Sequence, residues 1–368
     1  KFLSISNIFN ENSFGITTAR DHFAVGFNEQ EIKQRMLTFT SDLPDDLVAQ
    51  SLALKDTGEW NIKAARKAVK DIEWKQSIKP YSYRPFDFRR IVYLSVLIER
   101  DRMEIMQHLS DKDNLSLSLT RRLRDQDWKH VFATHFITDK TLLSSRDNCY
   151  CFPLYLYERA EKTKKSSLKS VMMLFEPEAD YGVRKPNLSA EVVERLSKAF
   201  KKTPSPEEIF YYIYAVLYSE IYRTKYAEFL KIDFPKVPFT KDYKLFKKMS
   251  EYGNRLVNLH LLKSQELDSP IARFQVEGGN RVEKPKYDDK TGRVHINEEQ
   301  YFEGIPQAVW SYQIGGYQVC DKWLKDRKER VLSLDEIQIY CRIVTAISQT
   351  IEIQKKIDEI YGKIENTI

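Results

Sequence analysis

Apolar and polar residues alternate in several short runs between residue 78 and about residue 156. An alternation of period two, bounded by turn-forming residues, is typical of strands that bury one face. We therefore expect a mixed sheet in this part of the chain, interrupted by one helix over 100–109. The predicted strands cover residues 91–93, 115–120, 131–134 and 150–157.

Apolar residues at helical spacing dominate the rest of the chain. Ser189 and Ser205 stand where side-chain oxygens cap helices, and Pro206 fits a first helical turn. The Tyr-rich helix that follows Ser205 is expected to be core. The predicted helices cover residues 28–39, 61–70, 189–200, 205–219, 222–230, 241–249, 252–262 and 333–361.

A section over 267–305 is richer in Gly, Asn and Lys, and predicts a hairpin around Lys290-Thr291-Gly292. Together, the predicted strands and helices indicate an α+β protein with a mixed-sheet N-terminal lobe. A helix-rich C-terminal lobe follows, with a short β section and a long final helix. We expect three parts, over residues 1–75, 76–200 and 201–368.

Composition narrows the class of protein. Apolar residues make up 42% of the 368 positions, near the globular norm, and no run reaches the roughly 18 apolar residues of a membrane helix. The sequence begins at Lys1 with neither Met nor a signal pattern, so we expect a cut point within a longer protein. The four cysteines are interpreted as buried free thiols in a reducing cytoplasm.

Positive charge is concentrated in one stretch. Residues 119–202 hold 17 Lys and Arg against 11 Asp and Glu, a difference of +6 that equals the net charge of the whole chain. A basic surface gathered in one region suits a polyanion, because each neutralised phosphate releases bound counterions.

Several catalytic signatures are missing from the sequence. There is no Pro-Pro dipeptide for a methyltransferase tetrapeptide, Gly278-Gly279 and Gly315-Gly316 lack a further spaced glycine, and no Gly-Lys-Ser/Thr loop occurs. The six histidines lack the spacing of a zinc site. Asp45, Glu73 and Lys75 imitate a nuclease carboxylate pattern, which a chain with 30% charged residues produces by chance.

From Tyr81 onward, many ordered blocks carry a family resemblance. They cover residues 82–90, 97–100, 130–132, 137–139, 152–157, 209–219, 223–230, 233–242, 314–319 and 322–328. These blocks resemble the target-recognition region of type ISP enzymes, which are single-polypeptide, ATP-dependent restriction–modification proteins. Residues 15–21 resemble the junction after the methyltransferase domain of such enzymes, while 158–185 and 265–292 match nothing in them.

The resemblance implies a role for each part. Residues 1–75 would be a junction after an absent methyltransferase domain, and 76–200 the recognition lobe. The chain would bind double-stranded DNA, contact the methyltransferase domain of the same polypeptide, and hold no catalytic centre, metal or cofactor. Its parent would methylate adenine with S-adenosylmethionine, and cleave unmodified DNA with ATP and Mg.

Candidate DNA contacts are basic or polar residues in predicted loops, because phosphates need cations and base edges need planar donors. The strongest group is the arginine cluster after residue 120, whose alternative is a solvated loop paired with Asp125 and Asp127. For Lys162, Lys164 and Lys165 the alternative is a solubilising loop. For Gln318 it is a tight turn at Gly315-Gly316, and for Lys322 and Lys325 it is a charged helix face. The candidates are Thr17, Thr18, Arg20, Arg121, Arg122, Arg124, Lys129, Ser145, Arg146, Lys162, Lys164, Lys165, Gln318, Lys322 and Lys325.

Two other classes of function stay open at this point. The chain could contain part of a metal-dependent nuclease site built on Asp45, Glu73 and Lys75. Alternatively, it could be a scaffold that binds a protein partner through its helical lobe. Arg84, Asp87 and Arg89 are interpreted as a structural charge network around a buried turn at Pro85 and Phe86.

Overall fold

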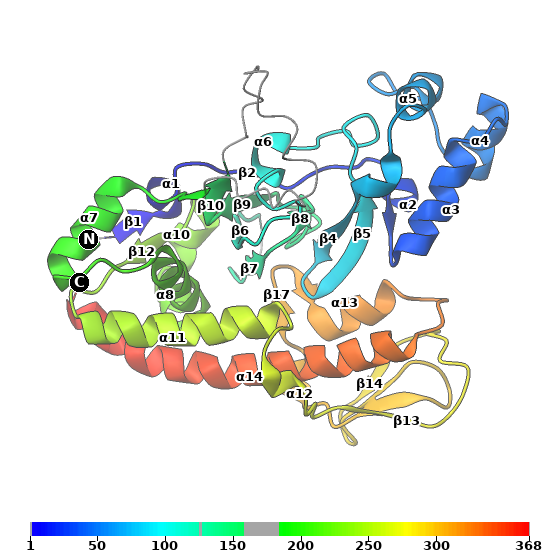
Figure 1. Ribbon diagram of the computed structural model, residues 1–368. Coiled ribbons are helices and arrows are strands. Elements are labelled where there is room, and N and C mark those ends of the chain that lie inside the picture. Colours follow the sequence, from blue (N-terminus) through cyan, green and yellow to red (C-terminus); the bar gives the residue numbers. More distant parts are fainter. Residues whose placement is uncertain (1, 125–126, 158–183, 368) are drawn as a thin grey trace, which may run out of the picture.

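A computed structural model describes residues 2–124, 127–157 and 184–367, and has the α+β architecture that the sequence predicts. In Figure 1 the strands between residues 78 and 157 occupy the middle of the molecule. Both termini lie at one end, beside helices α7 (Ala190–Phe200) and α11 (Tyr243–His260). Helices α3 (Glu29–Phe39), α4 (Asp45–Ser51) and α5 (Ile62–Val69) form the other end.

A four-stranded sheet packs against these last helices. Its order is β3-β5-β4-β8, antiparallel except that β4 and β8 run parallel. Asn28 and Asn61 cap α3 and α5, each accepting a backbone N–H from the first turn. The strands are β3 (Val25–Gly26), β4 (Ile78–Arg84), β5 (Asp87–Val92) and β8 (Ile137–Thr138), with the short helices α2 (Asp21–Ala24) and α6 (Met103–Met106) beside them.

A second four-stranded sheet lies in the middle of the molecule and is antiparallel, in the order β2-β9-β6-β7. All five residues of β6 are buried, including the polar side chains of Ser116, Ser118 and Thr120. The strands are β2 (Ser13–Phe14), β6 (Ser116–Thr120), β7 (Val131–Thr134) and β9 (Cys149–Pro153). Two further antiparallel pairs join β10 (Tyr155–Tyr157) to β11 (Arg184–Pro186) and β1 (Phe2–Ser4) to β12 (Lys236–Pro238).

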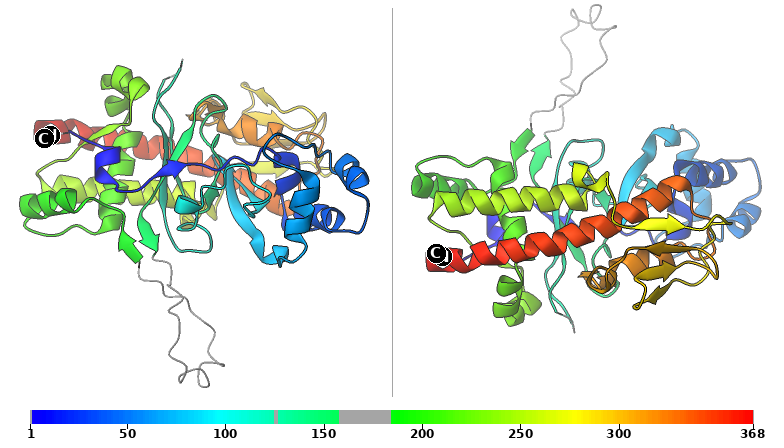
Figure 2. Two further views of the ribbon diagram at one scale, coloured as in Figure 1. Left: turned by 90° about the horizontal axis from the view of Figure 1, so that it is seen from above. Right: turned by 90° about the horizontal axis from the view of Figure 1, so that it is seen from below.

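Long helices cover this second sheet. Ser205 and Ser333 each form a capping box with the glutamate three residues later, which fixes the starts of α8 (Pro206–Tyr218) and α14 (Leu334–Ile364). The predicted cap at Ser189 is wrong, because its side chain makes no hydrogen bond to the first turn of α7. As predicted, the Tyr-rich α8 is core. Figure 2 shows α11 and α14 lying side by side along the molecule. The remaining helices of this part are α1 (Ile5–Ile8), α9 (Glu220–Lys225) and α10 (Ala227–Ile232).

The predicted hairpin at Lys290-Thr291-Gly292 is confirmed as the link between β14 and β15 of a small antiparallel sheet. This sheet lies near the start of α14, and a two-residue turn at Gly315-Gly316 follows it. The elements are β13 (Arg273–Gln275), β14 (Lys286–Asp288), β15 (Arg293–His295), β16 (Tyr301–Glu303), β17 (Gln313–Ile314), β18 (Tyr317–Gln318), α12 (Gln307–Trp310) and α13 (Val319–Lys325).

The prediction of two helices over 241–262 is wrong, because α11 runs unbroken through Gly253. A β-carbon on Gly253 would stand 1.8 Å from the carbonyl oxygen of Tyr211, so the glycine lets α11 approach α8 closely. The predicted helix over 100–109 is confirmed only as the single turn of α6.

The buried core forms two clusters. One gathers residues from 16 to 109, with Ile137 and Cys151. The other joins the second sheet to α8, α11 and α14, and so includes residues on both sides of residue 200. The boundaries at residues 75 and 200 stay predictions. All four cysteines are buried free thiols, as expected. Among the helices that the structure describes, none has the length and apolar character needed to cross a bilayer.

Candidate nucleic-acid interface

Two open hollows adjoin each other beside the strand ends of the second sheet. Their volumes are about 720 and 740 Å³, and they share a wall of three consecutive residues, Arg146, Asp147 and Asn148. We call the first the basic hollow and the second the polar hollow. The basic hollow is lined by Arg121, Arg122, Leu123, Arg124, Arg146, Asp147, Asn148, Tyr150, Lys231 and Ile232. The polar hollow is lined by Ile16, Thr17, Thr18, Ala19, Asp21, His22, Asp139, Lys140, Thr141, Ser145, Arg146, Asp147 and Asn148.

The basic hollow carries five Lys or Arg side chains against one carboxylate. Arg121 donates from Nε to a carboxylate oxygen of Asp233 at 2.7 Å, so its charge is partly neutralised. Arg122 and Arg124 are exposed and have no ion-pair partner among the described residues. An excess of unpaired guanidinium groups in a concave surface attracts anions, since their fields add there.

The polar hollow has a different chemistry. Its wall carries four hydroxyl side chains and three carboxylates, with Lys140 and Arg146 as the cations. Thr18 donates from its hydroxyl to Asp21, and the phenol of Tyr83 donates to the other oxygen of the same carboxylate at 3.3 Å. The surface therefore mixes donors and acceptors, where the basic hollow offers mainly donors.

The loop between β8 and β9, residues 139–148, forms the boundary between the hollows. Its first residue, Asp139, is buried and accepts hydrogen bonds from the Tyr81 phenol, from Arg84 at 3.1 Å and from the backbone N–H of Thr141 at 2.6 Å. Burial first, and the nearby Asp139 carboxylate second, raise the pKa of Tyr81 far above its ordinary value, so the phenol keeps its proton. This anchor fixes the start of the loop.

The end of the loop is held by a local turn at Ser144. The Ser144 hydroxyl accepts the backbone N–H of Arg146 at 3.1 Å and of Asp147 at 3.2 Å, and donates to the Asp147 carboxylate at 3.0 Å. Backbone bonds from Cys149 N–H to Lys140 and from Gly15 N–H to Cys149 close the loop against the sheet.

The Gly315-Gly316 turn packs against the same loop from outside. Gly316 donates its N–H to the Leu143 carbonyl at 2.8 Å, and the Tyr317 phenol donates to the Thr141 carbonyl at 2.9 Å. Gly315 donates to the carbonyl of Lys129 at 2.8 Å. The sequence allowed two interpretations of this turn, a DNA contact or a tight turn. These bonds support a tight turn, which packs against residues 139–148 and stabilises them.

The structure brings seven of the candidate residues into this surface. They come from three segments that are far apart in the sequence, which only the folded chain makes neighbours. The seven are Thr17, Thr18, Arg121, Arg122, Arg124, Ser145 and Arg146.

The candidate Arg20 lies elsewhere, with its side chain buried. It donates from Nη1 to the carbonyl of Thr18 at 3.1 Å, and its guanidinium lies 4.0 Å from the ring centroid of Trp60. Burial lowers the pKa of Arg20, an effect that Glu99 opposes. These contacts describe a structural arginine, so we leave Arg20 out of the interface. Lys162, Lys164 and Lys165 lie outside the described residues.

The other candidates lie outside both hollows. Lys129 is half-buried, and Gln318 donates its amide N–H to the Trp310 carbonyl at 2.8 Å. On α13, Lys322 pairs with Asp326 and Lys325 with Asp321. The charged-helix interpretation of this run therefore has the better support.

The expected charge network at the 85–86 turn is confirmed for Asp87 and Arg89, but Arg327 takes the place predicted for Arg84. The buried carboxylate of Asp87 accepts from Arg89 at 2.6 Å and from Arg327 at 3.0 Å. Burial alone would raise the pKa of Asp87, but Arg327 and Arg89 together hold it below its ordinary value. Arg84 belongs to the Asp139 anchor instead. Phe86 is buried, as expected, in a left-handed backbone conformation.

For the nuclease alternative, Asp45 is bound by Arg66 of α5, while Glu73 and Lys75 are exposed. Within residues 2–124, 127–157 and 184–367, no three His, Cys, Asp or Glu side chains come together as metal ligands would.

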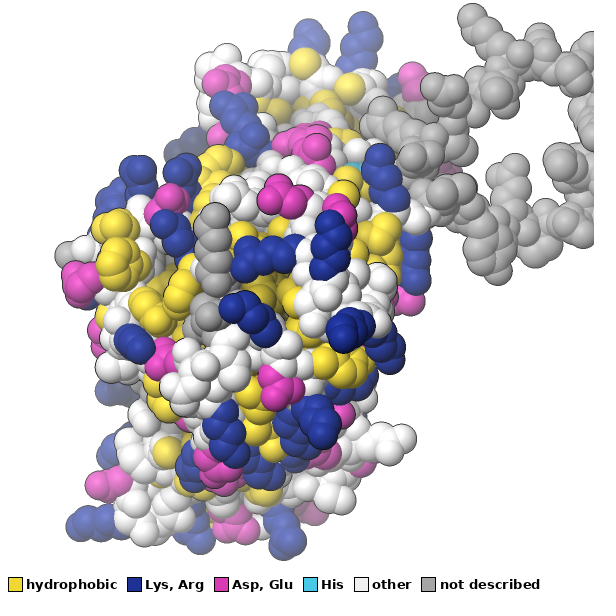
Figure 3. Space-filling view, turned by 90° about the vertical axis from the view of Figure 1, so that its left-hand side faces the viewer, with side chains coloured by type: hydrophobic (Ala, Val, Ile, Leu, Met, Phe, Trp, Pro, Cys, Tyr) yellow, Lys and Arg dark blue, Asp and Glu magenta, His cyan; other side chains and the backbone are white. Residues whose placement is uncertain are grey.

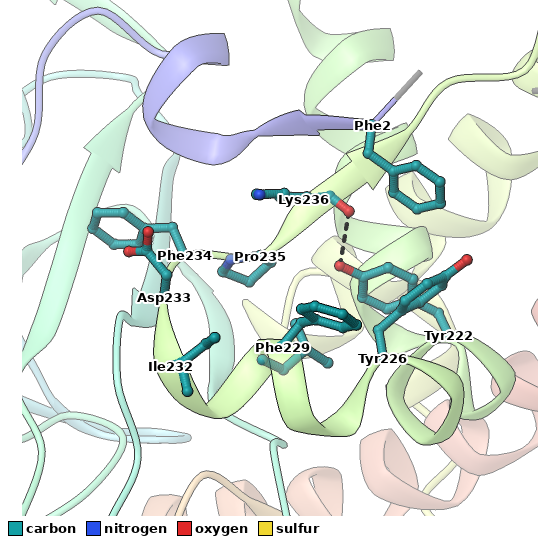
Figure 4. A pocket seen from close by; sticks show the side chains of 10 residues that line it. Phe2, Tyr222, Tyr226, Phe229, Ile232, Asp233, Phe234, Pro235 and Lys236 are labelled. Carbon is teal, nitrogen blue, oxygen red and sulfur yellow. Dashed lines mark hydrogen bonds between the residues drawn. The ribbon is translucent and has the colours of Figure 1, made fainter.

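An apolar pocket of about 210 Å³ adjoins the basic hollow, with Ile232 lining both. Figure 4 shows Phe2 of β1 facing Tyr226 and Phe229 across it, and the Tyr222 phenol bonded to the Lys236 carbonyl at 3.0 Å. On the end of the molecule seen in Figure 3, hydrophobic side chains gather left of centre among scattered Lys and Arg. Phe234 of this pocket packs under Arg121 and against Tyr150, which braces the neighbouring basic hollow.

Sequence reasoning missed Lys140, Asn148 and Lys231 in the hollows. Lys231 lies at the end of α10, more than a hundred residues after Arg121, so no local pattern joins the two. Asn148 had one usable signal, its place two residues after the candidate Arg146 in the same predicted loop.

Comparisons with known proteins agree on one architecture. The model of the family described as "Type ISP C-terminal specificity domain" matches residues 7–356. A comparison with the curated proteins found no match. Three solved structures share the fold. An ATP-dependent Type ISP restriction-modification enzyme, LlaBIII, bound to DNA, has 20% identity and a TM-score of 0.71, with 95% of this chain and 23% of that chain covered.

The second is a nuclease-deletion mutant of the Type ISP restriction-modification enzyme LlaGI, in complex with a DNA substrate mimic. It has 18% identity and a TM-score of 0.67, with 96% of this chain and 28% of that chain covered. The third, a DrdV–DNA complex, has 23% identity and a TM-score of 0.73, with 95% and 36% covered. The chain thus spans about a quarter to a third of the length of these proteins. Because the family match extends over nearly the whole sequence, the protein belongs to the Type ISP C-terminal specificity domains.

Proposed function

We propose that this chain binds duplex DNA and supplies the sequence specificity of a restriction–modification enzyme. The observation that carries the proposal is the pair of adjoining hollows, one strongly cationic and one rich in mixed donors and acceptors. Specific DNA binding needs both kinds of surface, because phosphate contacts position the protein and contacts to base edges read the sequence. The three structural neighbours were solved with DNA or a DNA mimic, which supports the same function here.

In this proposal the basic hollow holds the phosphate backbone. Arg122 and Arg124 would make the main contacts, because both are exposed and unpaired among the described residues. Thr17, Ser145 and Arg146 would lie closer to the bases. Lys162, Lys164 and Lys165 would add to the attraction of the backbone, as their sequence predicts.

The proposal extends to a parent enzyme. The resemblance of residues 15–21 to a post-methyltransferase junction supports a methyltransferase domain in the same polypeptide as the second partner. That domain would transfer a methyl group from S-adenosylmethionine to adenine, and further domains would use ATP and Mg to cleave unmodified DNA. The specificity domain itself would use no cofactor and catalyse no step. Its buried free thiols fit a cytoplasmic protein.

Binding to a random-sequence DNA library, followed by repeated selection at low salt and sequencing, tests the proposal. We expect enrichment of one site. A chain that retains no DNA at low salt, or that enriches no sequence, would contradict it.

A further inference from the structure

The two hollows differ in charge, which in the proposed function suits them to different parts of the DNA. The basic hollow has five cationic side chains and one carboxylate, whereas the polar hollow has three carboxylates, four hydroxyls and two Lys or Arg. Carboxylates repel phosphates, so a DNA backbone is held better in the basic hollow. Base edges present both donors and acceptors in the major groove, which suits the polar hollow. The wall between the two therefore lies where backbone contact gives way to base contact.

Asn148 stands in this wall with its side chain exposed, and lines both hollows. Its neighbours are committed elsewhere, since the Asp147 carboxylate accepts from Ser144 and Cys149 is buried in β9. The amide of Asn148 has no hydrogen-bond partner among the residues that the structure describes. It is therefore an available donor and acceptor at the boundary.

The backbone at Asn148 is held in place although its side-chain amide has no partner within the described part of the chain. The next residue, Cys149, donates its N–H to the Lys140 carbonyl at 2.8 Å, and the preceding Asp147 N–H is held by Ser144. The Asp139 anchor and the Gly316–Leu143 bond hold the other half of the loop. A side chain that discriminates between bases must be held in a fixed geometry by its surroundings. The 139–148 loop holds the backbone of Asn148 in this way.

We propose that Asn148 is a specificity-determining residue that reads one adenine of the recognised site. This inference rests on the proposed function and deepens it. A side-chain amide matches the adenine edge in the major groove, because its N–H donates to N7 while its oxygen accepts from the N6 amino group. No other base pair presents that order of acceptor and donor at the same positions.

Site selection with the 368-residue chain, its Asn148→Ala variant and its Asn148→Asp variant tests the inference. We expect the wild type to require adenine at one position, and Asn148→Ala to lose that preference alone, by about 5- to 150-fold. Asn148→Asp should shift the preference toward cytosine, whose N4 amino group a carboxylate accepts. Affinity for non-specific DNA and its salt dependence should stay unchanged in Asn148→Ala, since a neutral side chain is lost.

Asn254→Ala is the matched control, because Asn254 is an exposed asparagine of α11 outside both hollows. Thermal unfolding of each variant distinguishes a loss of base discrimination from a loss of the folded structure. If the wild type selects a site and Asn148→Ala selects the same site with equal discrimination, the inference is overturned while the proposed function stands. If the wild type selects nothing, both are overturned.

Discussion

Gly315 lies so close to Leu143 that a β-carbon at position 315 would stand 1.9 Å from the Leu143 carbonyl oxygen. Gly315 also has a φ of +60°, a conformation that other residues rarely adopt. The contact joins the turn between β17 and β18 to the 139–148 loop, across more than 170 residues of sequence. Only a glycine permits both the turn and the approach.

Gly315→Ala should therefore disturb the loop and weaken sequence discrimination. Backbone must move at either Gly315 or Leu143, and the left-handed conformation adds about 1–2 kcal/mol of strain. We expect the free energy of unfolding to fall by about 2 kcal/mol or more, measured by urea denaturation. Gly58→Ala is the control, since nothing lies within 4 Å of a β-carbon there. Equal stability of the two variants would contradict the close packing.

The exposed arginines of the basic hollow should govern the salt dependence of DNA binding. Arg122→Gln and Arg124→Gln each remove one phosphate contact, so each should lower the slope of log affinity against log salt by about 0.9. Affinity should fall for all sequences alike, in titrations by fluorescence anisotropy at several salt concentrations. Lys198→Gln on α7, outside the hollows, should leave the slope as it is. Slopes that match the wild type in both arginine variants would place the phosphates elsewhere.

Asp87 should be among the most sensitive positions for stability. Its buried carboxylate neutralises Arg89 and Arg327, and Arg327 also donates to Glu336 of α14 at 3.2 Å. Asp87→Asn removes the buried anion that Arg89 and Arg327 share, and leaves them only the less buried carboxylates of Asp326 at 3.6 Å and Glu336. This loss should cost about 3–5 kcal/mol in urea denaturation. Glu329→Gln removes an exposed pair with Arg281 and should cost less than about 1 kcal/mol. A mild effect at Asp87 would mean that water reaches this cluster.

Acid should destabilise the protein through its buried histidines. His260 accepts or donates hydrogen bonds with Tyr214 at 2.6 Å and Thr350 at 3.0 Å, and its ring stacks on Phe132. Burial first, and then Arg223, lower the pKa of His260 to about 3. The pKa of an unfolded histidine is about 6.5, so below that pH the unfolded state binds the extra proton.

Stability from His260 is thus complete above about pH 6.5 and falls as the pH drops toward 3. At pH 5 we expect a loss of about 2 kcal/mol from this residue, relative to pH 7. Urea denaturation at both pH values measures it. His260→Gln keeps polar groups for Tyr214 and Thr350 but does not titrate, so its loss between pH 7 and pH 5 should be smaller. A pH dependence identical to wild type would assign the effect to other groups.

Sequence patterns predicted a helix or strand well where the contacts that define it lie within the element itself. The predicted cap at Ser205 is confirmed, because a cap bonds within its own first turn. The predicted helix starts at Asn28, Asn61 and Ser333 also coincide with side-chain caps, whereas Ser189 makes no cap bond. The predicted break between residues 249 and 252 is absent, because α11 continues through this region and Gly253 lets it approach α8. That close contact lies between two helices, so no pattern within residues 241–262 contains it.

The same difference between local and distant contacts explains which residues of the candidate site could be predicted. Arginines after a strand and polar residues before the next one were visible in sequence, and Arg121, Arg122, Arg124, Ser145 and Arg146 do line the hollows. Arg20 and Lys322 looked equally suitable, but Trp60 and Asp326 lie beside them in space. Whether a charged side chain faces solvent or a partner depends on contacts between distant segments, and the sequence pattern does not contain these.

The three-residue wall between the hollows has a consequence for engineering. In the proposed function, phosphate contacts and base contacts meet at this wall. Exchanging residues 139–148 between related specificity domains should therefore change the recognised sequence, while Arg121, Arg122 and Arg124, which lie outside the exchanged segment, remain to hold the backbone. The Gly315-Gly316 turn would have to be exchanged together with residues 139–148, because a new loop that does not pack against Gly315 would lose its conformation.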